Sequence, residues 1–102
     1  MNRQHEDTTT RQLEALREEL DAIDGRLLED LHARLACCAR IGHHKRRYGV
    51  PMMQPHRIGV VQNRAKDFAL ANGLRPEFLR GLYELIIEET CRLEDEIIGP
   101  RR

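Results

Sequence analysis

The longest pattern in this chain of 102 residues is a stripe of apolar residues, three and four positions apart, between about residues 12 and 46. Its members are Leu13, Leu16, Leu20, Ile23, Leu27, Leu28, Leu31, Leu35 and Ile41. This spacing predicts one helix with a single apolar face. At ~1.5 Å per residue, such a helix is roughly 50 Å long. A domain of this size has a radius of gyration of about 13 Å, so one chain cannot cover the stripe. We therefore expect a second copy of the helix to cover it.

Two shorter helices are predicted after a proline-containing loop at residues 50–55. Pro55 suits the first turn of the second helix, and Asn72-Gly73 ends that helix with a left-handed cap. Pro76 begins the third helix, and Gly99-Pro100 ends it. The apolar face of the second helix consists of Ile58, Val61, Ala65, Phe68 and Ala69. The fold class predicted is all-α, with one long, one short and one medium helix.

The bulk properties set the class of protein. Residues 1–11 are polar and are expected to form a disordered leader, residues 12–99 the helical domain, and residues 100–102 a tail. The net charge is zero, which argues against nucleic acid as a partner. No apolar run is long enough for a membrane span, and no signal peptide is recognisable. The three cysteines are odd in number and lack metal-ligand spacing, which indicates a reduced, cytoplasmic protein without a bound metal.

The long helix carries two cations where apolar residues are expected. Arg34 continues the line of leucines that precedes it at seven-residue intervals. Lys45 follows eleven positions later, which returns it to within about 20° of Arg34, ~16 Å along the axis. Between them lie Cys38, Ile41 and Gly42, which form a small, apolar floor. Two long cations above such a floor suit a small dianion; the alternative is that both extend into solvent.

The third helix also places polar residues within its apolar stripe. Thr90 and Glu94 follow Tyr83 and Ile86-Ile87 at three- and four-residue spacing. A buried carboxyl group is costly unless it is paired or protonated. Glu94 is therefore either a functional acid or the partner of a cation on a neighbouring helix. Arg57, in the first turn of the second helix, is expected to be an ordinary surface residue.

Arg17 extends this group of polar residues only if two chains cooperate. It precedes Arg34 by seventeen positions, ~25 Å along the helix and ~100° around it. Both arginines reach one small ligand only if Arg17 comes from a partner subunit. The group contains no nucleophile–base pair, phosphate loop or metal cluster. It can bind a dicarboxylate and stabilise separated charge, and it implies no cofactor.

From Leu13 to Ile98 the chain resembles the all-helical chorismate mutases. The residues that carry this resemblance occur in order along nearly the whole chain: Leu16-Arg17, Ile23-Asp24, Leu27-Leu28, Arg34, Lys45, Pro55-x-Arg57, Gly73-Leu74 and Leu82-Tyr83-x-Leu85-Ile86-Ile87-Glu88. The resemblance implies an intertwined helical homodimer with two sites, each completed by an arginine of the other subunit.

The resemblance also implies a role for each residue. Arg17 of the partner subunit and Arg34 bind the substrate carboxylates, and Lys45 reaches the ether oxygen and a carboxylate. Arg57 lines the pocket. Thr90 matches a position with a hydroxyl near a carboxylate, and Glu94 matches the position that hydrogen-bonds the ether oxygen.

Two positions depart from most members of the family. Ile58 stands where a glutamate usually holds the C4 hydroxyl of chorismate, and Gln54 stands where an acid is frequent. The stretch from Gly49 to Arg57, together with residues 89–95, looks most like the 4-amino-4-deoxychorismate mutases of antibiotic pathways. The function implied is the Claisen rearrangement of 4-amino-4-deoxychorismate. The alternatives are an ordinary chorismate mutase that forms prephenate, an isochorismate pyruvate lyase, and a non-catalytic helical dimer.

Overall fold

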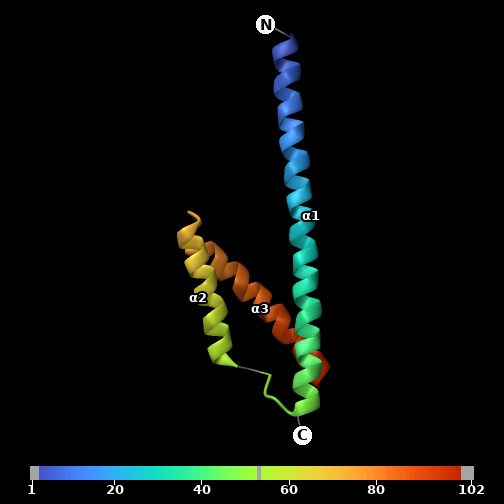
Figure 1. Cartoon of the computed structure of the whole chain (residues 1–102), viewed down its shortest axis with the longest axis vertical. Helices are drawn as coiled ribbons and strands as arrows, with labels where there is room; N and C mark the ends of the chain where they lie inside the picture. The colour runs from blue at the N-terminus through green and yellow to red at the C-terminus, as the bar shows by residue number, and fades with distance from the viewer. Residues whose placement is uncertain (1–2, 53, 100–102) are drawn as a thin grey trace. The chain divides into compact units, whose positions relative to one another are not determined.

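The computed structural model describes residues 3–52 and 54–99, which form three helices (Figure 1). These are α1 (Arg3–Tyr48), α2 (Pro55–Ala71) and α3 (Pro76–Ile98), and these residues contain no strand. The predicted all-α fold with a long, a short and a medium helix is confirmed. The chain divides into two compact units, residues 1–34 and residues 35–102. None of the helices in the described ranges is long and apolar enough to cross a membrane.

Helix α1 begins at Arg3 and not near Gln12, so the predicted start of the long helix is wrong. No proline or glycine separates these residues, and Thr8, Thr9 and Thr10 lie inside the helix and not before it. The apolar stripe begins only at Leu13, so periodicity gives no sign of the polar turns that precede it. The part of the expected leader from residue 3 onward is therefore helical. Residues 1–2 and the tail at 100–102 lie outside the described residues, and the division into domains stays a prediction.

The first unit consists of one helical segment with an uncovered apolar face. Every residue from 7 to 30 is exposed. The large apolar residues of the stripe in this segment are between 43% and 66% exposed: Leu13, Leu16, Leu20, Ile23, Leu27 and Leu28. Within its own unit the stripe thus has nothing to pack against.

In the second unit, α2 packs on α3 through small side chains. Ala65 and Ala69 are buried, and Ile58 and Val61 on the same face are half-buried, as predicted. Phe68 is 59% exposed although it was expected on this face. It lies about 100° around the helix from Ala69 and therefore at the edge of the contact.

The buried apolar core of one chain is small. In the described ranges its members are Cys38, Ala65 and Ala69, and no large side chain is fully buried. A domain of this length has little core to spare. The single chain therefore leaves much of its apolar surface uncovered.

The predicted helix boundaries after α1 are confirmed by their caps. Pro55 opens α2, and Gly73 has a φ of 68°, which places Leu74 N–H 2.9 Å from the Ala69 carbonyl. Gly99 has a φ of 75° and donates its N–H to Asp95 at the end of α3. Glycine adopts these positive φ values without the steric cost that a Cβ brings.

Candidate active site

Lys45 and Glu94 form a buried ion pair between α1 and α3. The Lys45 Nζ donates to Glu94 Oε1 at 2.8 Å, and the two side chains are 12% and 8% exposed. Taking a carboxylate out of water is costly unless a cation and hydrogen bonds replace the water. The two polar residues that interrupt the apolar stripes of their helices are therefore each other's partners. One of the two readings of Glu94, the partner of a cation on a neighbouring helix, is seen directly.

The loop after α1 supplies a second acceptor for Lys45. Lys45 Nζ donates to the Met52 carbonyl at 2.8 Å, while the Lys45 carbonyl accepts the N–H of Val50 at 2.9 Å. An ammonium group has three N–H donors. Two are occupied by these acceptors, and within residues 3–52 and 54–99 no further acceptor takes the third.

A close approach of α1 to α3 accompanies this ion pair. Gly42 is buried, one turn before Lys45 on the same side of α1. A Cβ at this position would lie 3.4 Å from Glu94 Cγ and 3.4 Å from two side-chain carbons of Ile97. The absence of a side chain at Gly42 lets the last turns of α3 lie against α1.

Thr90 lies one turn before Glu94 on α3 and is half-buried. Its hydroxyl donates to the Ile86 carbonyl at 2.9 Å and accepts a weak hydrogen bond from the buried Cys38 thiol, with 3.8 Å between sulfur and oxygen. Of the apolar floor expected from Cys38, Ile41 and Gly42, Cys38 lies beside Thr90 and Gly42 beside Glu94, whereas Ile41 is 44% exposed. The second unit thereby gathers Lys45, Thr90 and Glu94 at one junction of α1 and α3.

The three candidate residues at the beginning of α2 have a different environment. Gln54 and Arg57 are exposed, and Ile58 is half-buried. In residues 54–99 and 3–52, the side chains of Gln54 and Arg57 form no hydrogen bond or ion pair with the protein. The Gln54 carbonyl accepts the N–H of Arg57 at 2.9 Å and thus begins the helix. An exposed cation and amide at this place remain accessible to a ligand.

The two remaining candidates lie in the first unit. Arg17 is exposed on α1, in the segment whose apolar stripe is uncovered, and Arg34 is half-buried at the end of that unit. Their role in binding a dicarboxylate stays a prediction.

Sequence reasoning missed two contacts at this junction. The Met52 carbonyl is a backbone group, so the type of residue at position 52 gives no sign that it accepts from Lys45. Arg46 Nη1 donates to the Ile97 carbonyl at 3.1 Å. A signal for Arg46 was present, because α1 carries Lys45, Arg46 and Arg47 in its last turn whereas α3 has no basic residue in its own last turn. Cations near a helix C-terminus interact favourably with its carbonyl groups.

The exposed side of α3 holds a separate charged group. Arg92 donates to Glu89 and, at 2.6 Å, to Glu96, and all three side chains are 44% exposed or more. The hydrogen bond from Arg92 lowers the pKa of the Glu89 carboxyl group, and Glu89 in turn raises the pKa of Arg92. These pairs lie on the side of α3 opposite to Glu94 and do not belong to the junction with α1.

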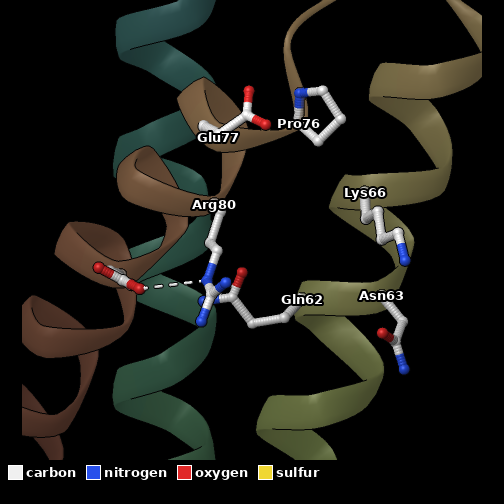
Figure 2. Close-up of a pocket in the computed structure, with 7 residues that line it drawn as sticks. Gln62, Asn63, Lys66, Pro76, Glu77 and Arg80 are labelled. Carbon is white, nitrogen blue, oxygen red and sulfur yellow. Dashed lines mark ion pairs between the residues drawn. The ribbon is translucent and has the colours of Figure 1, made fainter.

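A polar groove of about 490 Å³ lies between α2 and α3 (Figure 2). Figure 2 shows Gln62 extending from α2 toward Arg80 of α3, which forms an ion pair with Glu84 at 3.5 Å. The Gln62 Oε1 atom is buried without a hydrogen-bond partner, and it is therefore not open to a ligand. No predicted site residue lines this groove.

Comparison with known proteins agrees with the predicted resemblance. The pattern of a family described as chorismate mutase type II matches residues 16–95, which include every predicted site residue. A 4-amino-4-deoxychorismate mutase of Streptomyces pristinaespiralis is 55% identical over 87 residues, 85% of this chain and 67% of that protein. One of Streptomyces venezuelae is 46% identical over 92 residues, 90% of this chain and 89% of that protein. A T-protein of Enterobacter agglomerans is 33% identical over 86 residues, 83% of this chain and 23% of that protein.

Replacement of Lys45 by methionine tests the energetics of the buried pair. Lys45→Met leaves Glu94 buried without its cation, so we expect the free energy of unfolding at neutral pH to fall by about 3 kcal/mol. Urea denaturation at one fixed protein concentration measures this loss. The double variant Lys45→Met/Glu94→Leu, which removes both charges, is expected to regain most of it.

The control is Arg80→Met, because the Arg80–Glu84 pair is 78% and 60% exposed. Exposed pairs contribute little, so this change is expected to stay within about 0.5 kcal/mol. Equal losses for Lys45→Met and Arg80→Met would contradict the inference that the buried Glu94 carboxylate depends on the cation of Lys45.

Proposed function

This chain belongs to the chorismate mutase type II family, and we propose that it rearranges 4-amino-4-deoxychorismate to 4-amino-4-deoxyprephenate. The observation that supports this choice of substrate is the 55% identity to a 4-amino-4-deoxychorismate mutase over most of this chain. The neutral residues Gln54 and Ile58, at positions where acids are frequent in chorismate mutases, support the same choice. Cys37, Cys38 and Cys91 form no disulfide among the described residues, which suits a reducing cytoplasm as the place of the reaction.

The proposed reaction requires no covalent bond between the protein and the substrate. The ether C–O bond breaks while a C–C bond forms, in one pericyclic step without a cofactor. The enzyme needs to hold the substrate in its folded, diaxial conformer and to stabilise the negative charge that grows on the ether oxygen. An acceleration of ~10⁶, about 8 kcal/mol, lies at the low end of what enzymes achieve. Oriented cations and one hydrogen-bond donor are sufficient for such a task.

Lys45 and Glu94 are the proposed catalytic residues. Lys45 is held by the Met52 carbonyl and Glu94 at 2.8 Å each, so the direction of its third N–H is fixed. We assign this donor to the ether oxygen and a carboxylate. Glu94 donates a second hydrogen bond to the same oxygen when it carries a proton. In the ligand-free protein the same carboxyl group accepts from Lys45, which keeps it in place before substrate binds.

The remaining candidates are proposed to bind the substrate. Arg34 and Arg17 of the partner subunit bind the two carboxylates, and Arg57 lines the pocket. Thr90 donates to one of the carboxylates after its hydroxyl turns from the Ile86 carbonyl. Gln54 and Ile58 border the C4 substituent. A bound dianion neutralises the guanidinium and ammonium groups around it, which would otherwise repel one another.

A homodimer with shared active sites completes the proposal. The stripe on α1 from Leu13 to Leu28 is exposed in the single chain, and the buried core is small. A second copy provides an apolar face of the same length and pattern. Arg17 lies in this segment, so dimerisation would bring it to the site of the partner subunit. This supports the sequence-based expectation that Arg17 acts across the interface.

The substrate is tested by offering three compounds separately. We expect 4-amino-4-deoxychorismate to be converted to its prephenate analogue with a kcat/KM at least tenfold above that for chorismate, because Ile58 and Gln54 offer no acid to the C4 hydroxyl. Isochorismate is the third compound, and release of pyruvate from it would identify a lyase. Product identification by mass spectrometry is the measurement. A higher kcat/KM for chorismate would contradict the proposed substrate but leave the family unaffected.

Glu94 is tested by replacing its carboxyl group with an amide. Glu94→Gln places a permanent N–H donor in nearly the same volume. We expect this variant to keep substantial activity, since its amide N–H replaces the donor that the protonated carboxyl group supplies to the developing oxyanion. Glu94→Ala removes the donor, and its kcat is expected to fall ~10²-fold. A kcat for Glu94→Ala equal to that of Glu94→Gln would make Glu94 a structural partner of Lys45 only.

The shared site is tested by mixing two inactive variants. Arg17→Ala and Arg34→Ala are each expected to be nearly inactive, because each removes a carboxylate ligand. After subunit exchange, a hybrid dimer contains one site with both arginines intact, so part of the activity returns. Native mass spectrometry checks that exchange has occurred. Sedimentation of a stable folded monomer at micromolar concentration, or exchange without recovery, would refute the shared site.

A further inference from the structure

Besides the proposed catalytic pair, contacts of Gly42 and Arg46 join the last turns of α1 to the last turns of α3. Gly42 faces Glu94 and Ile97, and an added Cβ would already lie 3.4 Å from their side-chain carbons. Lys45 bonds Glu94, and Arg46 bonds the Ile97 carbonyl at 3.1 Å. On α1 the three residues lie within one turn, as Glu94 and Ile97 do on α3. The contacts therefore form a single interlocked junction.

We propose that Gly42 and Arg46 are positioning residues for the mutase reaction, which set the spacing of α1 and α3 so that the Glu94 carboxyl group meets Lys45. Neither residue touches the substrate in this proposal. Gly42 sets how closely the helices approach, and Arg46 holds the last turn of α3 in register with α1. The proposal rests on the proposed function, since the geometry that it explains is that of the proposed catalytic pair.

The spacing at Gly42 decides which side chains the junction tolerates. A Cβ at 3.4 Å from Glu94 Cγ and from two Ile97 carbons makes ordinary van der Waals contacts. A γ carbon adds ~1.5 Å beyond Cβ, so a β-branched residue overlaps these atoms unless α3 moves outward. An outward movement of ~1 Å stretches the 2.8 Å bond between Lys45 and Glu94 beyond the range of a good hydrogen bond.

Arg46 supplies what the end of α3 lacks. The Ile97 carbonyl is one of the last four of this helix and has no intrahelical N–H partner. The last turn of α3 contains no basic residue. The guanidinium group of Arg46 donates to this carbonyl from α1 and places a positive charge at the negative end of α3. Because Ile97 is three residues after Glu94, this bond fixes the rotation of the turn that carries Glu94.

The first test is a graded substitution at Gly42 assayed with 4-amino-4-deoxychorismate. Gly42→Ala fits the space and is expected to change kcat less than about twofold. Gly42→Val is expected to lower kcat ~10- to 100-fold, as small displacements of catalytic groups do, with KM within about threefold of wild type. The matched control is Gly59→Val, an exposed position in α2 with nothing within 4 Å of an added Cβ. It makes the same chemical change in a helix and is expected to leave kcat within about twofold.

A double-mutant cycle separates positioning from general damage. If Gly42→Val acts through Glu94, it costs less than about twofold in kcat when Glu94 is already alanine. A loss in kcat that is the same in both backgrounds would show that Gly42 is merely structural and would overturn the proposal. Circular dichroism and thermal melting establish that each variant is folded.

Arg46 keeps the proposal testable even if Gly42→Val does not fold, because Arg46 is exposed. Arg46→Met keeps the aliphatic stem but removes the donor, and kcat is expected to fall about fivefold with little change in KM. Arg46→Lys retains a charged donor and is expected to restore at least half of the loss. A wild type inactive on all three compounds would refute the proposed function. An active wild type with kcat unchanged in Gly42→Val or Arg46→Met would refute only the positioning role.

Discussion

The buried carboxylate of Glu94 imposes a constraint that much of the second unit satisfies. A carboxylate that is 8% exposed is stable only beside a cation and hydrogen-bond donors. Lys45 is the cation, and the Met52 carbonyl accepts a second hydrogen bond from its ammonium group. The end of α1, the loop after it and the end of α3 therefore have to meet at one place.

Such a pair is a poor device for stability alone. Replacing a buried ion pair by apolar residues of similar volume is often neutral or stabilising, so its presence calls for another reason. The proposed reaction supplies one, because a fixed ammonium donor and a neighbouring acid can face an oxygen that gains negative charge. An arrangement already in place before the substrate binds needs no reorganisation during the reaction. In the proposed reaction, stabilisation of the transition state offsets the free-energy cost of burying Lys45 and Glu94.

The helices pack through small side chains, and the buried core of the single chain is small. Ala65 and Ala69 let α2 and α3 pack closely, and Gly42 does the same for α1 and α3. These residues bring helices together but bury little apolar area. The exposed stripe on α1 is large by comparison, and in the proposed dimer it would contribute much of the missing burial. On this view, folding, assembly and completion of the active site by Arg17 are one event.

The sequence by itself determined the helices, the family and the unusual residues. Prolines and glycines act locally, so Pro55, Gly73 and Gly99 marked helix ends correctly. Periodicity showed that Lys45 and Glu94 interrupt apolar faces, because a helical face depends only on residue number. The same rule failed at the beginning of α1, where the polar turns carry no apolar residue to mark them.

Only the tertiary structure decided which of these residues meet. Periodicity gives the direction of a side chain but not the distance to another helix, which depends on every side chain in the contact. The 2.8 Å bond from Lys45 to Glu94 and the 3.4 Å approach at Gly42 are of this kind. The bonds from Lys45 and Arg46 to the carbonyls of Met52 and Ile97 also depend on the tertiary structure. Every residue has the same backbone acceptor, so only packing determines which carbonyl a cation reaches.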